Sequence, residues 1–109
     1  MLKATKFKPA EVAVFVRTST WSGSSEALDK WADHVTIRVA PMVRGLAGVA
    51  GAVFVIDRVG HSAMTVTLWE TEEAALVSDQ HAEASRSATV AATGVELVTR
   101  GRYEVVTKF

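Results

Sequence analysis

The chain lacks cysteine, has only two prolines among its 109 residues, and carries no net charge. Without cysteine there is no disulfide, thiolate metal site or cysteine nucleophile, and we expect a cytoplasmic protein. Twelve basic and twelve acidic side chains argue against nucleic acid or an anionic membrane surface as the main partner. No apolar run approaches the length of a membrane span, and the first residues do not have the pattern of a secretory signal, so we expect a soluble protein.

The length predicts one domain, residues 1–109, because a chain of this size can bury roughly two-thirds of its unfolded surface. Residues 1–10 mix Lys, Thr, Phe and Pro without a clear period, and we expect an N-terminal arm there. The apolar share of 49% is high for so small a chain. A monomer of this size has limited interior in which to bury so many apolar side chains.

Apolar alternation and helical spacing predict six elements: strands at 11–18, 52–56, 63–70 and 95–108, and helices at 25–46 and 71–93. Thr71 is a suitable N-cap for the second helix, and Glu72 and Glu73 follow in its first turn, where the helix dipole stabilises anions. Gly101 indicates a bulge in the last strand. The order strand, helix, strand, strand, helix, strand predicts an α+β, ferredoxin-like βαββαβ fold, with both helices on one face of an antiparallel sheet.

The later half of the first helix has two interpretations. Val35, Ile37 and Val39 alternate with polar or small neighbours, as in a strand, and Pro41 would kink or end a helix. Apolar residues nevertheless recur at three- and four-residue steps through the segment, which is typical of a helix: Leu28, Trp31, Val35, Val39, Met42, Val43 and Leu46. We prefer a long, kinked helix.

The predicted sheet has more apolar surface than two helices can cover. Residues 52–56 are apolar on both alternating faces, so either Val53 and Val55 or Phe54 and Ile56 would face water in a monomer. A second copy of the chain is the simplest cover. The sequence therefore predicts a homodimer in which the two sheets pack face to face.

Two short motifs suggest a family. Gly48-Val49-Ala50-Gly51 lies before the second strand, and Thr67-Leu68-Trp69-Glu70-Thr71-Glu72-Glu73-Ala74 joins the third strand to the second helix. They resemble the G-F-x-G and T-x-W-E-S-x-E-A elements of the dimeric alpha-beta barrel family of antibiotic biosynthesis monooxygenase-like proteins. This resemblance implies a dimeric barrel and a small-molecule ligand.

The family includes cofactor-independent oxygenases of polycyclic aromatic metabolites, haem-degrading enzymes, isomerases or lyases, and proteins with no assigned activity. Trp69 matches the tryptophan of the aromatic-oxidising relatives, whereas Ala75 stands where those relatives carry a tyrosine. Ser78 and Ser87 stand where haem-degrading relatives carry a tryptophan and a histidine, so haem is the weaker expectation. An oxygenase of the first kind would need no cofactor.

His81 is the candidate catalytic residue. It is the only ionisable member of a stripe that we expect to face the sheet: Ala74, Val77, His81, Ala84, Ala88 and Ala91. An imidazole over an alanine-lined cavity could act as a general base or a hydrogen-bonding anchor. The alternatives are a core histidine bonded to a backbone carbonyl, or a slightly rotated helix that exposes it.

Four large side chains are candidate ligand contacts: Trp69, Trp31, Trp21 and Met64. Each tryptophan also has a purely structural interpretation, because large aromatic residues at these positions would pack in the core or cover the end of the barrel. The three histidines are scattered and have no carboxylates at metal-ligand spacing, so we predict no metal site. The sequence thus favours a homodimer that binds a small apolar or aromatic molecule and possesses cofactor-independent oxygenase activity, with a non-catalytic binding or assembly protein as the alternative.

Overall fold

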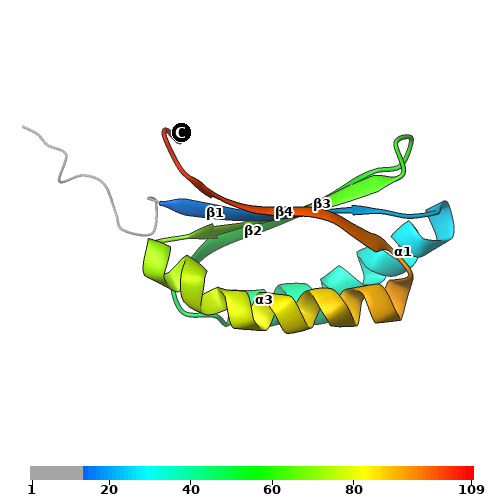
Figure 1. The fold of residues 1–109 in the computed structure, drawn as a ribbon, viewed down its shortest axis with the longest axis horizontal. Helices are drawn as coiled ribbons and strands as arrows, with labels where there is room; N and C mark the ends of the chain where they lie inside the picture. Colours follow the sequence, from blue (N-terminus) through cyan, green and yellow to red (C-terminus); the bar gives the residue numbers. More distant parts are fainter. Residues whose placement is uncertain (1–13) are drawn as a thin grey trace, which may run out of the picture.

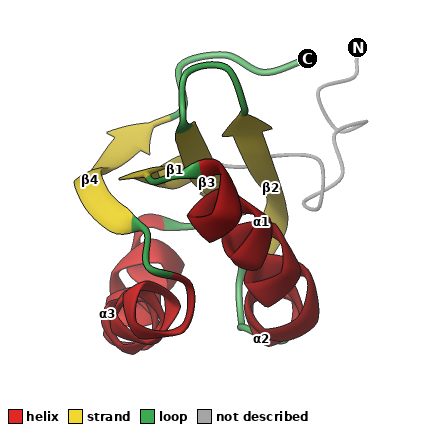
Figure 2. Ribbon diagram, turned by 90° about the vertical axis from the view of Figure 1, so that its right-hand side faces the viewer, coloured by secondary structure: helices red, strands yellow, loops and turns green. Residues whose placement is uncertain are grey.

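A computed structural model describes residues 14–109, so the predicted arm at 1–10 and the predicted strand start at 11–13 lie outside the described residues. Its sheet has the strand order β2-β3-β1-β4, and all neighbouring strands are antiparallel. The helices pack on one face of this sheet (Figures 1 and 2). The predicted ferredoxin-like βαββαβ fold is confirmed, with these elements: β1 Phe15–Ser22, α1 Ser25–His34, the π-helix η3 Val35–Val39, α2 Ala40–Arg44, β2 Val49–Asp57, β3 Ser62–Trp69, α3 Glu72–Thr93 and β4 Glu96–Glu104.

The first helical segment is continuous from α1 through η3 to α2, so the strand interpretation of residues 35–39 is wrong. Proline explains the wider π turn. Pro41 has no N–H to donate and its ring would clash with the carbonyl four residues earlier, whereas in the π segment the Ala40 N–H reaches back to the Val35 carbonyl. Buried residues at steps of four, Trp31, Val35, Val39 and Val43, then lie along one side of the helix.

The long helix α3 is rotated relative to the prediction. Thr71 caps it by accepting a hydrogen bond from the Ala74 N–H, as expected. The stripe predicted to face the sheet is wrong, however, because five of its six members, all except Ala74, are exposed. The buried side is instead made largely of small and polar residues: Ala75, Ser78, Arg86, Thr89 and Thr93.

Hydroxyl groups can occupy this buried side because they bond to the preceding turn of their own helix. Ser78 Oγ donates to the Ala75 carbonyl at 2.7 Å, and Thr89 Oγ1 donates to the Ser85 carbonyl at 2.8 Å. Such bonds satisfy a polar side chain without a tertiary partner. A periodicity search for apolar residues therefore selects the wrong side of this helix.

Strand ends differ from the sequence expectation in two places. β1 continues to Ser22, so Trp21 lies inside the strand and not in the loop before the helix. The irregularity in β4 falls between the pairs Thr20–Thr99 and Trp21–Leu97, which leaves Val98 as the extra residue. The bulge predicted at Gly101 is therefore wrong, since Gly101 pairs in register with Thr18.

The two family-like motifs form one junction at the end of the sheet. Gly48 has φ +80°, and a Cβ built on it would lie 2.5 Å from the Ala74 Cβ. The Gly48 carbonyl also accepts a hydrogen bond from the Glu70 N–H at 2.8 Å. Only glycine can adopt this φ without strain and let the start of α3 approach so closely. The junction fixes where α3 leaves β3.

The opposite face of the sheet has no cover from the described elements, as Figures 1 and 2 show. Because side chains alternate along a strand, Trp21, Thr67 and Phe54 point to the helices while their neighbours point away. Several apolar residues on the uncovered face are partly exposed in this single chain: Val53 (51%), Val55 (44%) and Met64 (38%). These three residues define what we call the open face.

Candidate functional site

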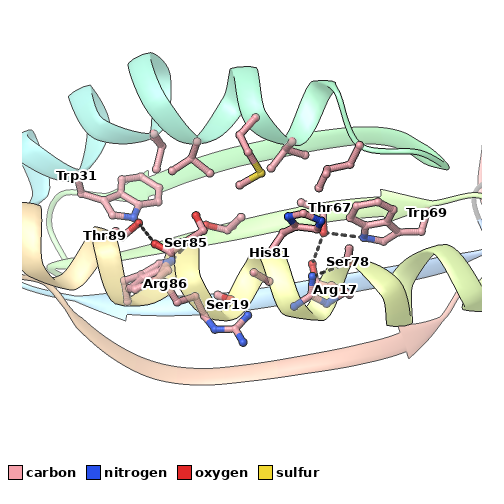
Figure 3. A pocket seen from close by; sticks show the side chains of 18 residues that line it. Arg17, Ser19, Trp31, Thr67, Trp69, Ser78, His81, Ser85, Arg86 and Thr89 are labelled. Atoms are coloured by element: carbon pink, nitrogen blue, oxygen red, sulfur yellow. Dashed lines mark hydrogen bonds between the residues drawn. The ribbon is translucent and has the colours of Figure 1, made fainter.

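A cavity lies between the helices and the sheet, and all three tryptophans of the chain line it. The space between the lining atoms is about 570 Å³ when the solvent at the open mouth is included. The interior volume that the centre of a water-sized molecule can occupy is only about 60 Å³. Figure 3 places Trp31 and Trp69 at opposite ends, with His81 between them. We call this space the tryptophan pocket; its other lining residues are Arg17, Ser19, Trp21, Val35, Val39, Met42, Val43, Leu46, Thr65, Thr67, Ser78, Ala82, Ser85, Arg86 and Thr89.

Two of the tryptophans are held by hydrogen bonds to β3. The Trp21 indole N–H donates to Thr65 Oγ1 at 3.2 Å, and the Trp69 indole N–H donates to Thr67 Oγ1 at 2.9 Å. The two residues are 3% and 1% exposed, so both side chains are held in place as part of the pocket wall. This geometry combines the structural and pocket-lining interpretations of the two residues, because each side chain is part of the core and also faces the cavity.

Trp31 is different, because its indole nitrogen has no hydrogen-bond partner among the described residues. The side chain projects from α1 and is 2% exposed. A buried N–H without a partner is unusual in a folded protein, since leaving it unpaired costs about 1–3 kcal/mol. The Trp31 N–H is thus a free donor at one end of the pocket.

His81 lies at the mouth of the pocket. The residue is exposed because of the rotation of α3, yet it lines the cavity. An outer groove runs between the first helical segment and α3, and it shares Val39, Met42, His81 and Ser85 with the tryptophan pocket. These four residues therefore lie where a molecule would pass from the groove into the interior.

Met64 does not line this pocket. It pairs with Thr20 of β1 and Val55 of β2 and belongs to the open face, whereas its neighbours Ala63 and Thr65 point to the helices. The structure therefore brings together Trp21, Trp31, Trp69 and His81 and separates Met64 from them.

Two arginines form the polar wall of the pocket, and the sequence patterns missed both. Arg17 projects from β1, where its Nη1 donates to Ser78 Oγ at 3.0 Å and its Nη2 pairs with Asp79 at 2.9 Å. Arg86 projects from α3 and pairs with Glu83 at 3.1 Å, while its Nε has no partner among the described residues. Their side chains are only 12% and 10% exposed.

Burial lowers the pKa of Arg17 below its ordinary value. The Asp79 carboxylate acts in the opposite direction, and Arg86, Arg102 and Arg100 lower the pKa further. The guanidinium stays charged, because the ordinary pKa of arginine is far above neutral. Arg17 thus lies near three further cations, of which only Arg86 also lines the tryptophan pocket.

The spacing of polar residues in the sequence is the pattern from which these two arginines could have been predicted. Arg17, Ser19 and Trp21 alternate along β1 and face the helices, but a strand interpreted as apolar on both faces hides that period. Arg86 lies three residues before Thr89 and eight after Ser78, which is helical spacing for the true buried side. The signal is polar periodicity, which a search for apolar stripes ignores.

Within residues 14–109, no three histidine, aspartate or glutamate side chains gather as a metal-binding group. None of the helices described for this chain combines the length and apolar character needed to cross a membrane.

No family model matches the sequence. Uncharacterized proteins from two strains of Mycobacterium tuberculosis are each 33% identical to this chain over 61 residues, which is 56% of this chain and 27% of the relative. The chain therefore spans about a quarter of the length of the curated relatives it matches.

Solved structures provide the comparison with the whole fold. The monooxygenase ActVA-Orf6 of Streptomyces coelicolor, in complex with the ligand nanaomycin D, superposes with a TM-score of 0.70 at 19% identity, covering 94% of this chain and 92% of its own. A dimeric ferredoxin-like protein from an uncultured marine organism has a TM-score of 0.64 at 11% identity and covers 92% and 94%. This chain has the fold of the dimeric ferredoxin-like, alpha-beta barrel proteins. At these identities the likeness shows the fold alone.

Proposed function

We propose that this protein binds a small, largely apolar aromatic metabolite in the tryptophan pocket and acts as a homodimer. The observation that carries the proposal is the convergence of all three tryptophans on one cavity. Aromatic walls with few, well-placed polar groups are typical of ligand sites. The free Trp31 N–H supports a ligand with an acceptor oxygen, such as a carbonyl or phenolic group, at that end.

Ligand binding requires the pocket to widen. A cavity of about 60 Å³ holds a few water molecules, whereas a dry cavity that binds benzene is about 150 Å³. Met42 and His81 lie at the junction with the outer groove and are only partly buried or exposed, so they can move outward at low cost. The complex of the structurally similar Streptomyces protein with nanaomycin D makes that compound a suitable first probe.

Nanaomycin D should quench the tryptophan fluorescence of this protein in a saturable titration. Ala82 lines the pocket from α3, so Ala82→Leu should fill the cavity and raise the dissociation constant by at least about tenfold. Ala91→Leu adds the same side chain to an exposed position of the same helix and should leave binding unchanged. Far-UV circular dichroism verifies folding; equal binding by both variants would place the ligand elsewhere.

Oxidation of the ligand by dioxygen without a cofactor is the proposed activity. In this scheme a base removes a proton from a substrate carbon, and the resulting carbanion forms a C–O bond to dioxygen. The peroxide takes up a proton and loses water as its O–O bond breaks, which leaves a carbonyl group on that carbon, while the pocket excludes bulk water. His81 is the ionisable residue at the mouth that could take that proton. Ala75, which stands where the aromatic-oxidising relatives carry a tyrosine, is fully buried and is not among the residues that line the pocket, so this position adds no support for the oxygenase activity.

Substrate-dependent oxygen uptake tests the activity directly. With a panel of polycyclic phenols, His81→Gln should slow uptake by at least about a hundredfold, the effect of losing a general base. His61→Asn, at the exposed hairpin tip with φ 56°, is the matched histidine control and should keep the wild-type rate. Saturable binding without any oxygen uptake would instead support the non-catalytic binding protein.

The two positions that distinguish the haem-degrading relatives give haem no support in this chain. Ser78, at the first position where haem-degrading relatives differ, is buried and bonded to Arg17 and to the Ala75 carbonyl. Ser87, at the second, is exposed on α3. Neither position offers an axial ligand for iron.

A further inference from the structure

A second cleft lies outside the tryptophan pocket, between α3 and the β1–β4 side of the sheet, and it is rich in arginine. Its volume is about 350 Å³, and its lining contains four arginines, two carboxylates and a glycine: Arg17, Asp79, Glu83, Arg86, Arg100, Gly101 and Arg102. Figure 3 shows Arg17 and Arg86 projecting from the pocket toward the side where β4 runs. We call this site the arginine cleft.

Topology gathers these arginines from distant parts of the chain. Arg17 pairs with Arg102 across β1 and β4, and Ser19 pairs with Arg100, so Arg17, Arg100 and Arg102 point to the same face of the sheet. That face is the one that packs against α3, where Arg86 lies between Glu83 and Thr89. Like charges directly opposite each other on paired strands repel. The strand register thus concentrates positive charge at one place.

The two carboxylates compensate this charge only in part. Asp79 pairs with Arg17 at 2.9 Å and lies 4.0 Å from Arg102, and Glu83 pairs with both Arg86 and Arg100 at 3.1 and 3.3 Å. Each carboxylate is thus shared between two guanidinium groups, and the cleft keeps two excess positive charges. Asp79 and Glu83 are also 50% and 69% exposed, so water competes for them.

Arg86, which lines the cleft, has a donor without a partner in the described part of the chain. The Arg86 side chain is 10% exposed, and its Nε–H has no partner among residues 14–109. A guanidinium carries five N–H donors in a planar fork that matches the oxygens of phosphate and carboxylate groups. A buried cation with an unpaired donor, beside three further arginines, is arranged for an anion.

We propose that the arginine cleft binds an oxyanion, the phosphate or carboxylate group of a small molecule, with Arg86 at its inner end and Arg100 and Arg102 at its outer edge. Arg17 and Arg86 line both this cleft and the tryptophan pocket, so they form the common wall of two sites of opposite character. Anion binding in the cleft does not require a ligand in the tryptophan pocket. One small anion suffices to test it.

The test follows the arginine Nε–H signals by NMR during separate titrations with inorganic phosphate and with acetate, at ionic strength kept constant with sodium chloride. A saturable shift of the Arg86 Nε–H signal is expected, because that donor gains an acceptor. The tighter of the two probes identifies phosphate or carboxylate as the preferred group. No saturable shift with either probe, or an equal shift when chloride alone is raised, would overturn the site.

Variants at the outer edge separate specific binding from general attraction. The double variant Arg100→Gln with Arg102→Gln should raise the dissociation constant of the better probe by about tenfold or more, because two charged donors are lost. Both side chains are well exposed, at 58% and 39%, so the fold should be unaffected. Arg44→Gln removes an exposed charge from α2 and should change the constant by less than about twofold. An equal loss with Arg44→Gln would refute the proposal.

Discussion

Gly48→Ala should lower the free energy of unfolding by about 2–4 kcal/mol, which is a large part of the stability of a small domain. Two costs add. An alanine at φ +80° is strained by about 1–2 kcal/mol, and its Cβ would lie 2.5 Å from the Ala74 Cβ, so the start of α3 must shift. Urea denaturation followed by circular dichroism measures the loss as a lower midpoint at an unchanged slope.

Gly45→Ala is the matched control, since it adds the same methyl group three residues earlier. Gly45 has φ −88°, and the nearest atom to an added Cβ is the Met42 carbonyl oxygen at 3.7 Å. Its free energy of unfolding should therefore change by less than about 0.5 kcal/mol. Comparable losses in both variants would mean that the Gly48–Ala74 contact does not define the junction between the two motifs.

Val53→Glu should convert the proposed homodimer into a monomer, with a rise of at least about a hundredfold in the dimer dissociation constant. Val53 lies on the open face with Val55 and Met64, and it is 51% exposed in the single chain. A carboxylate there would stay hydrated in the monomer but would be buried between two sheets in the dimer, at a cost of several kcal/mol. Sedimentation velocity over a range of micromolar concentrations measures the shift.

Ile37→Glu provides the comparison on the helical side of the molecule. Ile37 is 66% exposed in η3, so this variant makes the same kind of charge change on a surface outside the sheet. It should sediment as the wild type does. A monomeric wild-type protein, or a dimer that Ile37→Glu dissociates and Val53→Glu does not, would refute the sheet-to-sheet arrangement.

Two of the solved structures with the same fold are of dimeric ferredoxin-like proteins, and their names do not say how the two copies pack. The physical argument is independent of them. A face with Val53, Val55 and Met64 exposed to water is costly for a single chain, and burying apolar area stabilises an assembly by roughly 25 cal/mol per Å². The C-terminal end of the chain leaves the sheet on the side opposite the helices (Figure 1), and its apolar residues Val106 and Phe109 are 93% and 116% exposed in the single chain.

The sequence by itself determined the order of the elements and the position of the junction between β3 and α3. Strand alternation and helix spacing are local properties, so βαββαβ could be predicted from them. Thr71 is likewise a local signal for a helix cap, and it caps α3 as expected. Three tryptophans could be proposed for the pocket because rings of that size belong in the interior or at a site.

Only the tertiary structure decided which side of α3 faces the sheet. Ser78 and Thr89 satisfy their hydroxyl groups within the helix, so the buried side is polar in sequence while the exposed side carries Val77 and several alanines. His81 consequently lies at the mouth of the pocket, and it does not face the sheet as predicted. The arginine cleft also required the register of β1 with β4, because Arg17 and Arg102 are far apart in the chain. Cross-strand pairing and helix rotation are set by the packing of the whole molecule, and local periodicity does not contain them.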